Sequence, residues 1–231
     1  MKVDSSPDDH MPTRTADLEL VHRFVTGEGS AAKTTLVLLH GTGGDENDMV
    51  PLAASLLPGA AVLSPRGAVR EGGMPRFFRR LSPGVFDLED LALRTEQLIR
   101  FVRGAVEKYH LDKSRLIAVG LSNGANIAAS VLLTEAGVFS HAVLLRAMVP
   151  FEPTHFPKLG GTPVLLAAGE WDPMATPEEA RRLETLLAAA GATPTLSFFD
   201  AGHELTRADV FAAAEWIAAV TDLRSTAPRP A

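Results

Sequence analysis

A serine between two glycines constrains the fold of this chain more than any other feature, because the residues around it change from strand-like to helix-like. Segment 120–124 has the sequence Gly-Leu-Ser-Asn-Gly and follows an apolar run at 115–119 that is typical of a buried strand. Residues 125–133 after it are mostly small or apolar and predict a helix. A sharp turn from strand to helix leaves room only for small neighbours, which accounts for the two glycines. In this context the pattern predicts a nucleophile elbow that presents Ser122.

Apolar runs and helical periodicities alternate along the rest of the chain. Strands are predicted at 18–25, 34–40, 60–64, 115–119, 142–145, 162–169 and 195–199. Helices are predicted at 46–57, 88–109, 125–133, 176–190 and 207–220. Alternation of this kind predicts an α/β fold with a mostly parallel central sheet of about seven strands and helices on both faces.

The length of 231 residues and a hydrophobic content of 46% suit a single domain with a large core. We expect that domain at 17–223, since no repeat or linker divides it. Residues 1–16 are polar and contain proline, so they predict a flexible N-terminal arm. Residues 224–231 are rich in proline and predict a flexible C-terminal tail.

Composition excludes several classes of function. A net charge of −6 argues against nucleic acid or an anionic membrane as the partner. The absence of cysteine excludes disulfides, cysteine metal sites and a cysteine nucleophile. No apolar run has the length of a transmembrane helix, and the first ten residues lack the apolar core of a secretory signal. We therefore expect a cytoplasmic protein.

Polar residues fit for chemistry follow several of the predicted strands, and the carboxyl ends of parallel strands meet at one edge of a sheet. Ser122, Asp172 and His203 come in the chain order of a hydrolase triad. Ser122 is the candidate nucleophile, His203 the candidate general base and acid, and Asp172 the candidate orienting carboxylate. The backbone N–H groups of Thr42 and Asn123 are candidates for an oxyanion hole.

Some assignments have rivals. Glu170 and Asp200 compete with Asp172 for the role of the acid, and the sequence alone excludes neither. His40 ends a strand before a glycine-rich loop, and we interpret it as a residue that orders this loop beside the substrate. Loop 41–44 lacks the Lys-Ser/Thr pair of a phosphate-binding loop, so a nucleotide site is disfavoured.

The segment 65–86 is predicted to be irregular and is rich in arginine and phenylalanine. In one interpretation the phenylalanines pack on the sheet while the arginines are solvated or paired with nearby acids. In the other the segment forms a pocket wall with an apolar floor and a cationic rim, suited to esters with a negative or polar group. The candidate substrate-binding residues are His40, Arg76, Phe77, Phe78, Arg79 and Trp171.

Five motifs in order resemble the phospholipase/carboxylesterase family of α/β-hydrolases, and within it the MhqD-like bacterial hydrolases associated with resistance to quinones. They lie at 40–48, 64–67, 75–80, 120–126 and 202–205. The resemblance implies an α/β-hydrolase fold without a separate lid domain, and Ser122, Asp172 and His203 as the catalytic triad. One position departs from the family pattern, since Ala147 stands where that pattern has proline.

We therefore expect a serine carboxylesterase that cleaves small acyl or aryl esters through an acyl-enzyme, with no cofactor and no metal. Related acyl-protein thioesterases share the fold, so a thioesterase or lysophospholipase-like activity is the alternative. A non-catalytic ligand-binding protein on a hydrolase scaffold is a second alternative. The expected partner is a small-molecule ester, and the expected state is a monomer or a homodimer.

Overall fold

The computed structural model describes residues 18–221, and the arm predicted at 1–16 and the tail predicted at 224–231 lie outside the described residues. Its centre is a seven-stranded sheet with the strand order β1-β3-β2-β8-β9-β10-β11. The strands are β1 (His22–Val25), β2 (Thr35–Leu39), β3 (Ala61–Pro65), β8 (Leu116–Leu121), β9 (His141–Leu145), β10 (Pro163–Gly169) and β11 (Thr193–Phe199). All neighbours in this sheet pair in parallel except β1 and β3.

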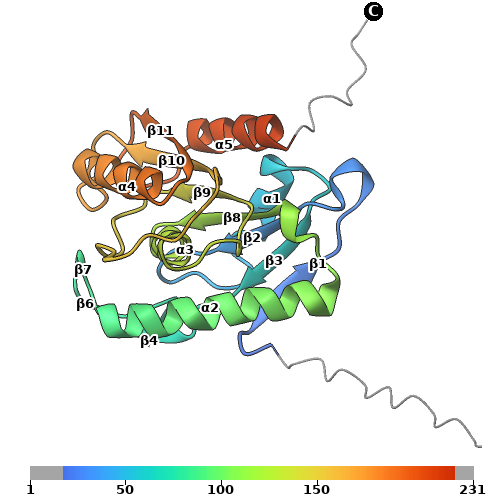
Figure 1. Cartoon of the computed structure of the whole chain (residues 1–231), viewed down its shortest axis with the longest axis horizontal. Coiled ribbons are helices and arrows are strands. Elements are labelled where there is room, and N and C mark those ends of the chain that lie inside the picture. Colours follow the sequence, from blue (N-terminus) through green and yellow to red (C-terminus); the bar gives the residue numbers. More distant parts are fainter. Residues whose placement is uncertain (1–17, 222–231) are drawn as a thin grey trace, which may run out of the picture.

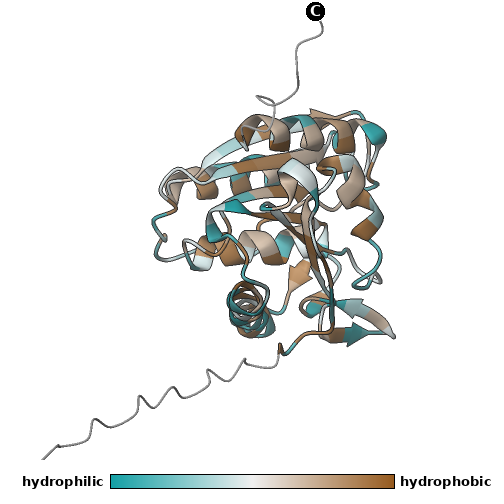
Figure 2. Cartoon of the chain, turned by 90° about the vertical axis from the view of Figure 1, so that its right-hand side faces the viewer, coloured by the Kyte–Doolittle hydropathy of each residue, from teal (hydrophilic) through white to brown (hydrophobic). Residues whose placement is uncertain are grey.

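Helices cover both faces of the sheet (Figures 1 and 2). The α-helices are α1 (Val50–Leu56), α2 (Leu88–Tyr109), α3 (Asn123–Thr134), α4 (Pro177–Ala189) and α5 (Arg207–Val220), with short 3₁₀ turns η1 (Gly29–Ala31) and η2 (Lys113–Arg115). Apolar side chains of α2, α3 and α4 form one core cluster with the sheet, and those of α1 and α5 form another on the opposite face. The predicted mostly parallel sheet with helices on both faces is confirmed.

Local sequence explains where the helices begin. Asp87 accepts a hydrogen bond from the amide of Asp90, so α2 begins at the predicted residue. Thr206 and Asp209 form a reciprocal capping box at the start of α5. The first helix was predicted from residue 46 but begins at Val50, because Asp45 and its neighbours form side-chain-to-backbone turns instead of helical bonds.

The prediction that segment 65–86 is irregular is wrong in part. It forms two short antiparallel hairpins, β4 (Val69–Glu71) with β5 (Met74–Arg76) and β6 (Arg80–Ser82) with β7 (Val85–Phe86). Gly72 and Gly73 turn the first hairpin at φ values of 58° and 87°, which side chains disfavour and glycine adopts freely. The two hairpins fold the segment over the carboxyl edge of the sheet.

One close approach fixes the start of α3 against the end of β2. A Cβ built on Gly124 would lie 1.9 Å from the carbonyl oxygen of Leu39. Only glycine fits there, and its presence brings the loop after β2 next to the elbow.

We expect Gly124→Ala to destabilise the fold by about 3 kcal/mol or more, at the upper end for overpacking, since backbone must move to admit the methyl group. Gly160→Ala is the contrasting control: Gly160 has a φ of 61°, in the left-handed region that Gly124 does not occupy, but no atom lies within 4 Å of the added Cβ. The control is expected to cost about 1–2 kcal/mol through strain alone. Urea unfolding of both variants measures the difference, and equal losses would contradict the steric account.

Candidate active site

The nucleophile elbow has the geometry that the sequence predicts. Ser122 lies between β8 and α3 with φ 52° and ψ −113°, a strained conformation for a residue with a side chain. Its amide donates to the carbonyl of Leu145, 2.8 Å away, and its own carbonyl accepts from Asn126. These bonds hold the turn while the hydroxyl projects into a cavity.

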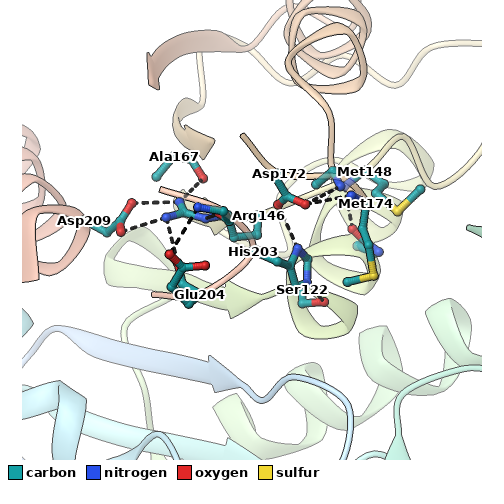
Figure 3. A network of polar contacts seen from close by, with 12 residues as sticks. Ser122, Arg146, Met148, Ala167, Asp172, Met174, His203, Glu204 and Asp209 are labelled. Carbon is teal, nitrogen blue, oxygen red and sulfur yellow. Dashed lines mark hydrogen bonds and ion pairs between the residues drawn. The ribbon is translucent and has the colours of Figure 1, made fainter. Parts of the chain in front are cut away.

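The structure brings Ser122, His203 and Asp172 together from three strand ends (Figure 3). His203 Nε2 lies 2.8 Å from Ser122 Oγ, and His203 Nδ1 lies 2.7 Å from Asp172 Oδ2. Because the carboxylate can only accept, Nδ1 carries the proton and Nε2 is free to accept the serine proton. The other oxygen of Asp172 accepts from the amides of Met174 and Ala175, so both oxygens of this buried carboxylate have hydrogen-bond donors.

The two carboxylates that compete with Asp172 for the role of the acid do not face His203. Asp200 accepts a hydrogen bond from the indole Nε1 of Trp171 at 2.8 Å, and Glu170 is exposed. Only Asp172, of these three acids, faces His203.

Two backbone amides border the cavity beside the serine. Asn123 is the first residue of α3, so its N–H has no intrahelical acceptor. Thr42 lies in the loop after β2, where its neighbour Gly43 donates to Pro75. Both Thr42 and Asn123 line the same cavity as Ser122. Their two N–H groups therefore stay the candidates for an oxyanion hole.

Side chains tie this edge of the sheet to the hairpin segment. Asn123 Oδ1 accepts from the amide of Phe77 at 2.7 Å, and Thr42 Oγ1 accepts from Arg76 Nη1 at 2.6 Å. Arg76 also donates to the carbonyl of Phe78 and pairs with Glu71. Burial, with the charge of Arg80 as a smaller cause, lowers the pKa of Arg76 from its ordinary value.

The cavity above Ser122 has a volume of about 310 Å³. Its apolar lining residues are Phe86, Leu121, Met148, Met174 and Leu205. Arg76 and Arg80 line it too, and both pair with Glu71. Arg146 and Glu204 border the cavity on the side of His203. The pocket therefore combines an apolar surface with charged groups, among which Arg76 and Arg80 share one carboxylate.

Several predicted substrate-binding residues do not line this cavity. Phe77 and Phe78, between the two hairpins, are 4% and 0% exposed and pack in the core, where the ring of Phe77 lies against His40 and that of Phe78 against Phe86. Arg79 points outward and pairs with Asp87 at 2.7 Å. Trp171 is 71% exposed. Of the predicted set, Arg76 is the residue that lines the cavity.

His40 orders its loop, as the sequence suggests, and lies outside the cavity wall. Its Nδ1 donates to the carbonyl of Gly41 and its Nε2 accepts from the amide of Gly67, so the ring is neutral in this arrangement. Burial lowers the pKa of His40 below 6.5, and the nearby carboxylates of Asp48, Asp45 and Glu46 oppose this shift without cancelling it.

Sequence reasoning missed two polar residues of the site. Asn126 lies one helical turn after Ser122, lines the cavity and accepts a hydrogen bond from the amide of Met148. The spacing of four residues on one helix was the signal that could have found it. Arg146 is completely buried beside the loop of His203, and its position directly after a strand was the corresponding signal.

Within residues 18–221, no helix is both long and apolar enough to span a bilayer. The same residues hold no cluster of three or more histidine and carboxylate side chains that could bind a metal ion.

The sheet order, the elbow and the hydrogen-bonded serine, histidine and aspartate define an α/β-hydrolase. The chain belongs to the phospholipase/carboxylesterase family, whose model matches residues 20–221. By that membership it is a hydrolase, as the resemblance of its motifs predicts.

Individual proteins that are similar to this chain support its membership of the family. The chain is 44% identical over 189 residues to the Bacillus subtilis (strain 168) protein named as the hydrolase MhqD, a match that covers 82% of this chain and 94% of that protein. A Bacillus cereus carboxylesterase structure is 44% identical with a TM-score of 0.83, covering 86% of this chain and 93% of that one. The structure of YahD with malic acid is 30% identical with a TM-score of 0.80, covering 87% and 98%.

Because the pKa of His40 is lowered in the folded protein, the free energy of unfolding depends on pH. A folded pKa below the unfolded value means that the stabilising contribution is complete above about pH 6.5 and is lost as the pH falls through the folded pKa. We expect the melting temperature of the wild type to fall more steeply than that of His40→Gln between about pH 7 and pH 5, the range in which histidines titrate. If the melting temperatures of the two proteins fell equally across this range, the lowered pKa of His40 would not explain the pH dependence.

Proposed function

We propose that this protein is a serine carboxylesterase that hydrolyses small acyl or aryl esters through an acyl-enzyme on Ser122. The observation that supports this most is the chain of two short hydrogen bonds from Ser122 through His203 to Asp172 at the floor of an open cavity. A serine, a neutral imidazole and a buried carboxylate in this order form the set that activates a hydroxyl for acyl transfer.

The steps follow from the positions of the atoms. Ser122 Oγ attacks the ester carbonyl carbon while its proton passes to His203 Nε2. The carbonyl oxygen becomes an oxyanion that the N–H groups of Thr42 and Asn123 stabilise. The tetrahedral intermediate expels the alcohol, which takes the proton from His203 and leaves an acyl-serine. Water then attacks the acyl carbon while His203 takes its proton, and the second tetrahedral intermediate collapses as His203 returns that proton to Ser122 Oγ and the acid is released.

Asp172 has a role that depends on its surroundings. Its Oδ2 fixes the proton on His203 Nδ1 and faces the imidazolium that forms during attack. Its Oδ1 is held by two backbone amides, so the carboxylate is kept in one orientation.

The cavity indicates the class of ester. A volume of about 310 Å³ lies at the small end of ligand sites, which favours short substrates. Arg76 and Arg80 share a single carboxylate, Glu71, so this wall has an excess of positive charge. We infer that a negative or polar substituent on the ester is bound here. The related YahD was solved with malic acid, a dicarboxylic acid, which agrees with this preference.

A fluorophosphonate that reacts with active serines should add once to each chain, and Ser122→Ala should abolish the addition. Ser130→Ala is the matched control, since Ser130 lies on the same helix, is buried and bonds to Thr95 instead of a histidine. Intact-mass spectrometry measures the adduct. A wild-type protein that is folded but stays unlabelled would favour the non-catalytic binding protein instead.

Asp172→Asn should lower kcat/KM on an activated ester by about 10³–10⁴-fold, as the loss of the correct tautomer does in serine proteases. Asp200→Asn is the control, because its carboxylate bonds to the exposed Trp171 and is expected to leave the rate within about threefold of wild type. Circular dichroism confirms folding of both. If Asp172→Asn kept its activity while Asp200→Asn lost it, the assignments would be exchanged.

Replacement of Arg80 by glutamine should reduce kcat/KM about tenfold more on a monoester of a dicarboxylic acid than on a neutral ester of equal length, one charge contact being worth about 1.4 kcal/mol. Arg79→Gln is the control from the same segment, because its guanidinium points to solvent and pairs with Asp87. The same panel should include the corresponding thioesters, which tests thioesterase activity. An equal loss on charged and neutral esters would remove the cationic wall from substrate recognition.

A further inference from the structure

Arg146 follows β9 directly and has no role in the steps above. Its side chain is 0% exposed, which is rare for arginine. Its φ of 57° places it in the left-handed region, where a residue with a side chain is strained. A buried charge on a strained backbone persists only where its surroundings determine it strongly.

All five N–H groups of the guanidinium have acceptors (Figure 3). Nε donates to the carbonyl of Gly202 at 2.9 Å, and Nη2 donates to the carbonyl of Glu204 at 2.9 Å. Nη1 donates to the carbonyl of Ala167 at 3.1 Å. The remaining two N–H groups bind the carboxylate of Asp209 in a forked pair at 2.7 and 2.9 Å.

The two carbonyls bound by Nε and Nη2 stand on either side of His203 in the chain. A rigid planar group therefore fixes the backbone on both sides of the histidine that contacts Ser122. Lysine could not do this, because its donors share one nitrogen and lack the fixed fork of arginine.

Arg146 is also connected to the other two residues of the triad. The preceding residue, Leu145, accepts the hydrogen bond from the amide of Ser122. Ala167, whose carbonyl accepts from both the backbone amide and the side chain of Arg146, lies in β10, the strand that leads to Asp172. One residue thus joins the three strand ends from which the triad comes.

Asp209 keeps the guanidinium in place. Burial alone would raise the pKa of this carboxyl, but hydrogen bonds from Arg146 and Thr206 outweigh burial and hold its pKa below the ordinary value. Buried ion pairs contribute little net stability, since desolvation offsets the attraction. The pair is therefore better explained by what the guanidinium orients than by stability.

We propose that Arg146 is a positioning residue for catalysis, which fixes the backbone of residues 202–204 so that His203 Nε2 stays within hydrogen-bond reach of Ser122 Oγ. This inference rests on the proposed function. The competing account is a structural one, in which the ion pair only stabilises the attachment of α5.

The experiment separates kcat from stability. Arg146→Lys is expected to lose about 100-fold in kcat with KM within about threefold of wild type, as a displacement of about 1 Å in a catalytic group does. The far-downfield proton resonance of His203 Nδ1–H should broaden, because the ring loses its fixed position. Ile217→Ala is the control: Ile217 is buried in α5 away from the guanidinium, so its loss should lower the melting temperature and leave kcat unchanged.

A second variant keeps the test decisive if Arg146→Lys does not fold. Arg146→Gly relieves the left-handed strain and should show the same loss of kcat, partly restored by millimolar guanidinium ion in the vacated space. Asp209→Asn should lose part of kcat as well as stability, since the forked partner of the guanidinium becomes neutral.

The outcomes distinguish the two proposals. Folded Arg146 variants with wild-type kcat and a sharp His203 resonance would overturn the positioning role while leaving the serine mechanism intact. A kcat that falls in proportion to melting temperature across all the variants, Ile217→Ala included, would also overturn it in favour of the structural account. Failure of the wild type itself to be labelled by a fluorophosphonate would instead remove the proposed function.

Discussion

The contact between the backbone of Gly124 and the carbonyl of Leu39 is the constraint on which the candidate site depends. Because no side chain separates them, the start of α3 lies directly against the end of β2. This proximity places Asn123 and the loop of Thr42 on the same cavity. The strained turn of Ser122 follows from it, since the chain must reverse within one residue to enter the helix.

The triad candidates could be found from the sequence because their positions follow from chain order and strand ends. Parallel strands leave their carboxyl ends at one edge, so polar residues just after strands meet there. The choice of Asp172 over Asp200 needed more, since both follow strands. In the structure, side-chain bonding separates them: Asp172 accepts two backbone amides and faces His203, while Asp200 is engaged by Trp171.

The pocket wall could not be predicted in the same way, because it depends on hairpin register. A shift of one residue in a strand turns its side chain to the other face. Composition alone shows that segment 65–86 is rich in arginine and phenylalanine, but only the folded hairpins place Arg80 on the cavity and Arg79 outside it. The position of Arg146 could not be predicted for two other reasons. A charged residue after a strand is ordinarily solvent-exposed. Its partner, Asp209, is also far away in the sequence.

In the proposed function, recognition of substrate charge and stabilisation of the transition state would share one residue. Arg76 lines the cavity, and the same guanidinium donates to the hydroxyl of Thr42, whose amide is a candidate oxyanion donor. Burial of the Arg76 cation is unfavourable, and the single carboxylate of Glu71 pairs with both Arg76 and Arg80. An anionic group on the substrate would neutralise the remaining positive charge, at the place where Arg76 holds the loop of Thr42. In the proposed function, the wall that would bind the charged group of the ester is therefore also the support of the candidate oxyanion donor.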